Sequence, residues 1–241
     1  MVYFVGAGSG ATDLITLRGK NLLERADAVI YAGSLVNPEL LKYTRAECEI
    51  FNSAGMTLEE IIAQIKKAES ENKMTVRLHT GDQSVYGAVR EQMDELEALG
   101  IEYESCPGVT AAFGAAASLN LEYTLPGISQ SLIITRMEGR TSVPEKESIE
   151  SFAAHGASMA IYLSAGMTGE LEKRLIAGGY APDTPAAIVY KATWPDERIF
   201  VCNVGSLHET AQKNGINRLA LVLVGDAIKH SVYERSKLYH K

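Results

Sequence analysis

Residues 76–88 read VRLHTGDQSVYGA, and the rest of the chain is organised around this stretch. The apolar, β-branched run over residues 74–78 predicts a buried strand, which ends in a tight turn at Gly81-Asp82. A helix is expected to open near Ser84 and to run to about residue 99. In open parallel α/β sheets, ligands bind at the carboxyl edge of the strands, which is where this turn falls.

The turn therefore has two interpretations. Asp82 offers a carboxylate to hydroxyl or amine donors, and Gly81 lets a ligand approach the backbone closely. Alternatively, Asp82 and Ser84 only cap the helix that follows, because both residue types favour that position.

The segments on either side of this stretch alternate between strand and helix patterns. Expected strands in the first half are 2–5, 28–31, 49–51, 74–78 and 101–105. Helical patterns lie between them, one of them opened by a capping box at Thr57–Glu60. Such alternation predicts a parallel sheet with right-handed crossovers.

A second alternating block follows a run of small residues around position 112. Its expected strands are 131–135, 158–163, 186–190, 199–204 and 219–224, with helices over 146–154, 168–177 and 206–212. Only eight residues, without a helix, join the strands at 186–190 and 199–204, which suits an antiparallel pair. The predicted fold is α/β with two domains, residues 1–112 with a parallel sheet and 113–241 with a mixed sheet.

The glycine-rich loop after the first strand has the pattern GAGSG at residues 6–10, not the GxGxxG of dinucleotide-binding folds. The second strand is followed by Ala32-Gly33 instead of the acidic residue that holds a ribose. Both features speak against a nicotinamide-dependent oxidoreductase. A purely structural turn remains an alternative for this loop.

The composition excludes further classes of protein. With 23 Lys and Arg against 30 Asp and Glu, the net charge is −7, which argues against nucleic acid as a partner. Cys48, Cys106 and Cys202 form no CxxC pair, so reduced thiols, a cytoplasmic location and no protein-bound metal are expected. No apolar run has membrane-spanning length, so no membrane association is expected.

Four segments, taken in order, resemble the tetrapyrrole methylase family of S-adenosylmethionine-dependent methyltransferases: VGAGSGATDLITLRG, VRLHTGDQSVYGA, CPGVTAAFGAAAS and IYLSAG. Three others, YAGSLVNPELL, TRMEGRTSVPE and VYKATWPDERI, resemble the branch that acts on precorrin-4 or cobalt-precorrin-4 in cobalamin synthesis. The resemblance implies methyl transfer to ring carbon 11, giving S-adenosylhomocysteine as product. It also implies a homodimer with the active-site cleft between the two domains.

The resemblance assigns site residues by motif. Contacts to the methyl donor are expected from Ser9, Thr80, Gly81, Asp82, Val85, Thr110, Ala111, Leu163 and Ala192. Expected contacts to the tetrapyrrole (precorrin) substrate are Gly8, Arg136, Arg140 and Trp194. No catalytic residue is assigned, because methyl transfer from a sulfonium relies largely on positioning and on excluding water.

Several of these residues have a plainer alternative. The two arginines suit a carboxylated macrocycle because Arg grips carboxylates through paired hydrogen bonds, but both also suit a solvated loop. Thr110 is also a typical helix cap, and Trp194 also suits packing at a domain interface. His79 is read as a core histidine and not as a cobalt ligand.

The chain also departs from the family pattern. Ser9 and Gln83 stand where the family usually has proline, and Ala11 where it often has Asp. Ala32 replaces an acidic residue of the uroporphyrinogen-methylating branch, which argues against that branch. The remaining alternatives are a sister methylase of different regiochemistry and a non-catalytic tetrapyrrole-binding module.

Overall fold

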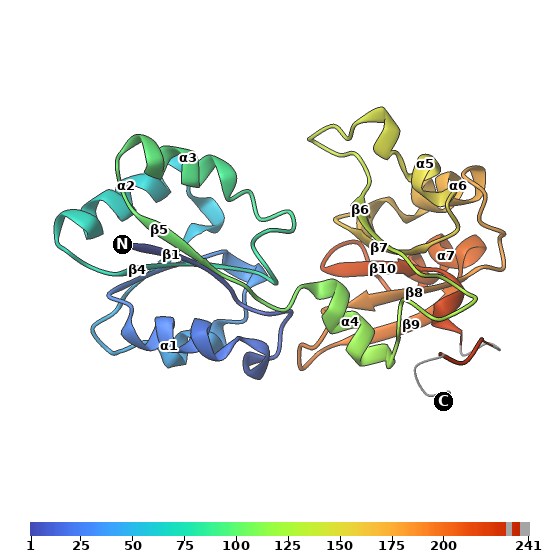
Figure 1. The fold of residues 1–241 in the computed structure, drawn as a ribbon, viewed down its shortest axis with the longest axis horizontal. Coiled ribbons are helices and arrows are strands. Elements are labelled where there is room, and N and C mark those ends of the chain that lie inside the picture. The colour runs from blue at the N-terminus through green and yellow to red at the C-terminus, as the bar shows by residue number, and fades with distance from the viewer. Residues whose placement is uncertain (230–232, 237–241) are drawn as a thin grey trace. The chain divides into compact units, whose positions relative to one another are not determined.

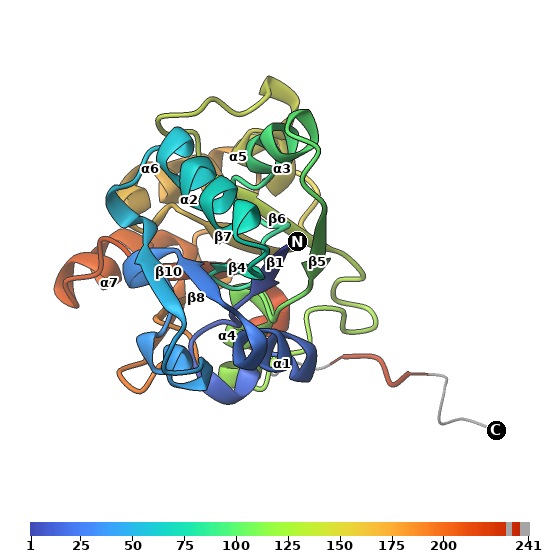
Figure 2. The same cartoon turned by 90° about the vertical axis from the view of Figure 1, so that its left-hand side faces the viewer.

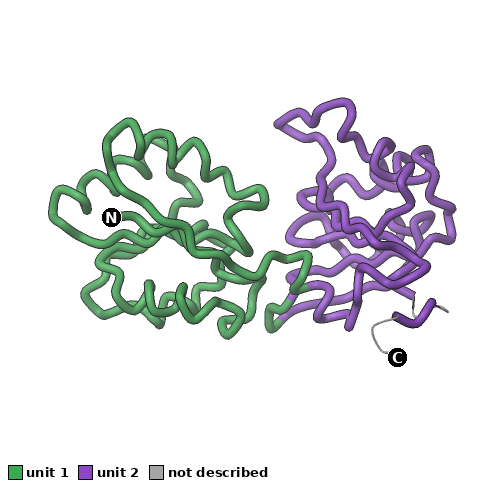
Figure 3. The backbone as a smooth tube through the Cα atoms, viewed as in Figure 1, with its two compact units in different colours: residues 1–114, 193–195 green, residues 115–192, 196–241 purple. Residues whose placement is uncertain are grey.

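The computed structural model describes residues 1–229 and 233–236, which form two compact units (Figure 3). Unit 1 comprises Met1–Gly114 together with Thr193–Pro195, and unit 2 comprises Ala115–Ala192 and Asp196–Lys241. Helix α4 (Ala111–Leu119) begins in unit 1 and ends in unit 2.

Unit 1 is built on a five-stranded parallel sheet in the order β3-β2-β4-β1-β5 (Figure 1). Its strands are β1 (Val2–Gly6), β2 (Ala28–Tyr31), β3 (Glu49–Asn52), β4 (Thr75–His79) and β5 (Tyr103–Cys106). Strand β4 is buried along its whole length, as a central strand of a parallel sheet should be. The predicted parallel sheet is confirmed.

Helices cover both faces of this sheet. Helix α1 (Leu17–Arg25) lies on one face, and α2 (Leu58–Ser70) and α3 (Arg90–Ala98) lie on the other, as both ribbon views show (Figures 1 and 2). The predicted capping box at the start of α2 is present, with Thr57 and Glu60 each accepting from the other's backbone N–H.

Unit 2 contains the predicted mixed sheet, in the order β6-β7-β10-β8-β9. Its strands are β6 (Leu132–Arg136), β7 (Ser158–Tyr162), β8 (Pro185–Tyr190), β9 (Arg198–Asn203) and β10 (Ala220–Val224). Strands β8 and β9 pair antiparallel, as their short connection predicts, whereas β6 and β7 are parallel. Helices α5 (Ile149–Ala153), α6 (Thr168–Ala177) and α7 (Leu207–Lys213) pack on the sheet through a shared apolar core.

One predicted element is wrong in its extent. The helix after Gly81-Asp82 opens at Arg90 and not near Ser84, because a turn intervenes over residues 83–86. Within the intervening stretch, Tyr86 and Ala88 have φ angles of 56° and 48°, a left-handed conformation that no α-helix contains. Asp82 and Ser84 therefore do not cap a helix.

Among the described residues, no helix combines the length and the apolar character that a membrane crossing requires.

Candidate functional site

Three loops meet at the carboxyl edge of the sheet in unit 1. They follow β1, β4 and β5, which are neighbours in the sheet, so their first residues emerge side by side. The loops after β1 and β4 are joined by a pair of backbone hydrogen bonds between Gly8 and Gly81, with N–O distances of 3.1 and 2.9 Å. The Ala7 amide also donates to the His79 carbonyl at 2.7 Å.

Glycines make this meeting of loops possible. A Cβ atom on Gly6 would lie 2.6 Å from the Cα of Gly108, and a Cβ on Gly108 would lie 2.2 Å from the Gly81 oxygen. Both distances are impossible for real side chains, so backbone packs directly on backbone here. The glycines of this loop thus have a structural use that does not depend on a ligand.

Asp82 ties two of these loops together. One carboxylate oxygen accepts from the Gly108 amide at 2.8 Å, and the other accepts from the backbone amide and the hydroxyl of Ser84. Partial burial opposes ionisation of Asp82, but these hydrogen bonds outweigh it and lower the pKa of the carboxyl. The result is a partly buried, ionised carboxylate at the strand edge.

Thr110 and Ala111, both predicted donor contacts, lie against Gly81. A Cβ on Gly81 would be 3.5 Å from the Thr110 Cα and 3.7 Å from the Ala111 nitrogen. Thr110 is buried, and its carbonyl accepts the first backbone bonds of α4, from Phe113 and Gly114. Gly8, Gly81, Asp82, Thr110 and Ala111 are thus brought together at one edge.

The glycine-rich loop is also held from its other side, by the segment Thr193–Pro195. The hydroxyls of Ser9 and Thr193 are 3.0 Å apart, and Thr193 Oγ1 accepts from the Ala11 amide at 3.1 Å. The indole N–H of Trp194 donates to the Ser9 carbonyl at 3.1 Å. Ser9 and Trp194, assigned to donor and substrate from distant segments, are therefore direct neighbours.

Thr193 is a residue that the sequence did not single out. Its partner Ser9 lies 184 positions earlier, and no local pattern indicates such a contact. Thr193 also has a φ of 67°, and the preceding Lys191 has a φ of 48°. Between these two strained residues lies the buried Ala192, a predicted donor contact.

Leu163, another predicted donor contact, directly follows β7 in unit 2. Its side chain is 68% exposed and its φ is 53°. An exposed apolar residue in a left-handed conformation is unfavourable on both counts, and such outliers are typical of ligand-contacting positions. Thr80, by contrast, is exposed without such strain, and Val85 is half-buried.

The two candidate substrate arginines differ. The Arg136 guanidinium donates to three carbonyls of the loop that follows it, those of Met137, Thr141 and Ser142, at 3.0 to 3.1 Å. Arg140, at the tip of that loop, is exposed. Arg136 thus shapes the loop, while Arg140 is the more accessible cation.

Arg136 also lines a pocket of about 520 Å³ in unit 2. Four glutamates line it against two arginines; the charged residues are Arg136, Arg174, Glu138, Glu145, Glu150 and Glu170. Arg174 is paired with Glu138, Glu150 and Glu170. The excess negative charge makes this pocket unsuited to a carboxylated macrocycle.

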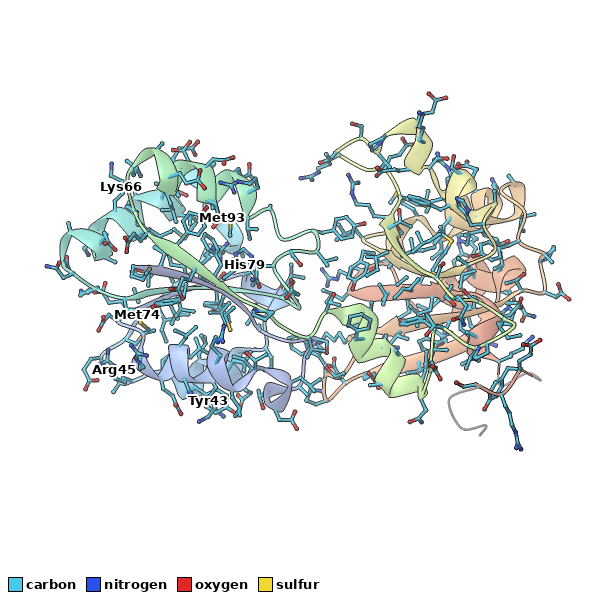
Figure 4. The ribbon with its side chains drawn as sticks, viewed as in Figure 1. Tyr43, Arg45, Lys66, Met74, His79 and Met93 are labelled. Atoms are coloured by element: carbon cyan, nitrogen blue, oxygen red, sulfur yellow. The ribbon has the colours of Figure 1, made fainter. Side chains whose placement is uncertain are left out.

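His79, labelled in Figure 4, ends β4 directly before the Thr80-Gly81 turn. It is 4% exposed and its ring lies 6.0 Å from that of Phe4. Burial, with the charge of Arg77 adding to it, lowers its pKa to about 3, so the imidazole is neutral. Its Nε2 has no hydrogen-bond partner, so the histidine is a core residue as predicted, but not a fully satisfied one.

Across residues 1–229 and 233–236, no three His, Cys, Asp or Glu side chains are grouped so that they would hold a metal ion.

The chain is a two-unit α/β protein, with a parallel sheet followed in sequence by a mixed sheet. Its candidate site lies at the carboxyl edge of the parallel sheet, where the loops pack through glycines. Residues 1–208 match the sequence model of the tetrapyrrole (corrin/porphyrin) methylases. The chain belongs to this family, so the predicted family is confirmed.

Named relatives cover the whole chain. The cobalt-precorrin-4 C(11)-methyltransferase of Methanocaldococcus jannaschii is 50% identical over 240 residues, which span 100% of this chain and 93% of the relative. The enzyme of the same name from Priestia megaterium is 44% identical over 243 residues, spanning 100% and 94%. Both names belong to the precorrin-4 branch of the family, which is the branch that the sequence indicates.

Solved structures agree with the fold. The crystal structure of a cobalt precorrin-4 methyltransferase, a cobalamin biosynthetic enzyme, matches with a TM-score of 0.92 and 44% identity over 95% of each chain. A uroporphyrin-III C-methyltransferase from Thermus thermophilus, in complex with S-adenosylhomocysteine, matches with a TM-score of 0.80 and 25% identity, covering 95% of this chain and 93% of the other.

Proposed function

We propose that this protein transfers a methyl group from S-adenosylmethionine to C-11 of precorrin-4 or cobalt-precorrin-4 in cobalamin synthesis. The observation that carries the proposal is the likeness to enzymes of that name over the full chain, at 50% identity for the archaeal relative. The strand-edge arrangement of unit 1 supports it, because it places the backbone of Gly8 and Gly81 next to an ionised carboxylate at the edge where parallel sheets bind ligands.

The donor is proposed to sit against Thr80, Gly81 and Asp82, next to Thr110 and Ala111. Two features of this strand edge suit the methyl donor. The Asp82 carboxylate suits amine and hydroxyl groups, and the buried Gln83 Oε1 beside it lacks a hydrogen-bond donor. Ser9, Val85, Leu163 and Ala192 complete the proposed contacts, and the strained backbone at Leu163 and around Ala192 supports that assignment.

The donor, when bound, supplies an electrophilic methyl on a positively charged sulfur. The chain's own contribution is to bind, orient and desolvate the reactants. Asp82 and the glycine loops hold the donor's polar ends, and the Trp194 indole borders the glycine-rich loop, where a flat ring system would contact it. Gly8 and Arg140 are proposed to contact the substrate, and Arg136 to shape the loop that carries Arg140.

The domain boundaries, oligomeric state, location and ligands of the protein are also proposals. We infer domains of residues 1–112 and 113–241, a homodimer, and a cytoplasmic location. The donor and the tetrapyrrole are the proposed ligands, with neither nucleic acid nor a protein-bound metal required; any cobalt would arrive as part of the substrate.

Incubation with S-adenosylmethionine and either precorrin-4 or cobalt-precorrin-4, followed by mass spectrometry, tests whether the protein methylates these substrates. The expected product is one methyl heavier than its substrate, with uroporphyrinogen III unmethylated in a parallel reaction. Donor binding without transfer to either precorrin would favour a sister methylase or a non-catalytic tetrapyrrole-binding module. An absence of donor binding in calorimetry would refute the methyltransferase assignment.

A further inference from the structure

A buried guanidinium lies in the strand that leads to the candidate site. Arg77, in the middle of β4, is only 5% exposed, and no carboxylate among the described residues is within ion-pair distance of it. Its Nη1 donates to the Ile30 carbonyl at 3.1 Å, and its Nε donates to Gln92 Oε1 at 3.0 Å. A buried charge is costly unless it is hydrogen-bonded, so these neutral acceptors matter.

Gln92, in the first turn of α3, connects this charge to the chain after Gly81-Asp82. The side chain is 4% exposed, and its Nε2 donates to the Ala88 carbonyl at 3.0 Å. A guanidinium can only donate hydrogen bonds, so Arg77 forces the amide oxygen of Gln92 to face it. The amide N–H₂ must then face Ala88.

The segment around Ala88, which accepts this hydrogen bond, has an unfavourable backbone conformation. Ala88 and Tyr86 both have left-handed backbone angles, which residues other than glycine rarely adopt. Between them, a Cβ on Gly87 would lie 2.1 Å from the Gln83 oxygen. The stretch from Gln83 to Val89 is therefore a tightly wound turn that needs support from its surroundings.

From this arrangement we infer that Gln92 is a positioning residue for the donor site. Oriented by Arg77, its amide holds the Ala88 carbonyl and so fixes the turn over residues 83–89. That turn continues directly from Gly81-Asp82, so its shape sets where Gln83 and Tyr86 lie relative to the Asp82 carboxylate. The inference rests on the proposed function for the identity of the ligand, but not for the support of the turn.

The variant Gln92→Glu separates the two hydrogen bonds. A carboxylate still accepts from Arg77 and neutralises its charge, but it cannot donate to the Ala88 carbonyl. The fold is expected to survive, with the unfolding midpoint within about 3 °C of wild type. Gln212→Glu, the same change at an exposed position of α7, is the matched control.

Two measurements on Gln92→Glu decide the inference. Hydrogen exchange of the amides of residues 84–89 should become about tenfold faster, as expected for the loss of one hydrogen bond. Binding of S-adenosylhomocysteine, measured by calorimetry, should weaken about tenfold for the same reason. Gln212→Glu should change neither. Unchanged exchange and unchanged affinity in Gln92→Glu would overturn the inference.

The failure of the proposed function is distinguishable from the failure of this inference. If wild-type protein does not bind S-adenosylhomocysteine, the proposed function fails, while the exchange result still decides whether Gln92 supports the turn. If Gln92→Glu does not fold, the wild-type protein gives the answer by NMR. The side-chain amide of Gln92 should then exchange at least about tenfold more slowly than that of exposed Gln212, and equal rates would overturn the inference.

Discussion

Asp82 holds two turns in place with one carboxylate, and this limits what it can offer a ligand. Both oxygens already accept protein hydrogen bonds, one from Gly108 and the other from Ser84. A carboxylate oxygen can accept more than one hydrogen bond. Asp82 can therefore contact the methyl donor while it keeps its hydrogen bonds to Gly108 and Ser84.

Asp82→Ala should therefore have two effects. The unfolding free energy, measured in urea, should fall by about 2 kcal/mol, because the half-buried Gly108 and the exposed Ser84 lose hydrogen bonds to a charged group. Affinity for S-adenosylhomocysteine should fall about tenfold or more. Ser84→Ala, which removes only the hydroxyl contact, is the milder control. Wild-type donor affinity in Asp82→Ala would rule out a role for this carboxylate in binding.

His79 gives the protein a predictable sensitivity to acid. Its folded pKa of about 3 lies below the ordinary value of 6.5, so between these pH values the unfolded chain binds a proton that the folded chain does not. Stability therefore falls as the pH is lowered through this window, by up to about 1.4 kcal/mol per pH unit. Asp82, whose pKa is also lowered, acts in the same direction at the acid end.

Replacing the imidazole with a ring that does not titrate should remove this slope. His79→Phe should keep its unfolding free energy better than wild type between pH 6 and pH 4, as measured by urea denaturation at each pH. His155→Gln, at an exposed position, should leave the wild-type slope in place. If His79→Phe loses stability with acid as steeply as wild type does, the histidine does not stay neutral in the fold.

At the scale of elements, the loops after β1, β4 and β5 pack through bare backbone. Gly6→Ala would place a Cβ 2.6 Å from the Gly108 backbone, and neither neighbour has a flexible end that can give way. We expect a loss of about 3 kcal/mol in the unfolding free energy, as in other overpacked interiors. Gly55→Ala, where nothing lies within 4 Å, should change stability by only about 0.5 kcal/mol. Equal stability of the two variants would contradict the packing described.

Local sequence patterns predicted the elements themselves well. Strand β2 and helix α6 have the predicted bounds, and the capping box of α2 forms, because each depends on residues that are close in sequence. The antiparallel pairing of β8 and β9 followed from the length of their connection. The Gly81-Asp82 turn follows directly after β4, as the apolar run over residues 74–78 predicted.

The details of the site were not predictable in the same way. The turn over residues 83–89 looks helical in sequence, since Tyr86 and Ala88 are not residue types that signal a left-handed turn. Its shape depends on Gln92, whose orientation depends on Arg77, a residue that reads only as part of a buried strand. Ser9 and Thr193 are 184 positions apart in the sequence, so no local pattern indicates their contact.

For the whole molecule, the proposed function is regiospecific methyl transfer. The family and the strand-edge site make S-adenosylmethionine the expected donor, and the precorrin-4 relatives make ring carbon 11 the expected acceptor. Neither donor binding nor a gain of mass distinguishes C-11 from another carbon of the macrocycle. The position of the new methyl does.

The most direct measurement is therefore a reaction with S-adenosylmethionine carrying a ¹³C-labelled methyl, with cobalt-precorrin-4 as acceptor and NMR of the purified product. We expect a single enriched methyl resonance that correlates with C-11 of the ring. An enriched methyl on any other ring carbon would contradict the assigned regiochemistry, and an unlabelled macrocycle, with the protein folded and the donor bound, would contradict the activity itself.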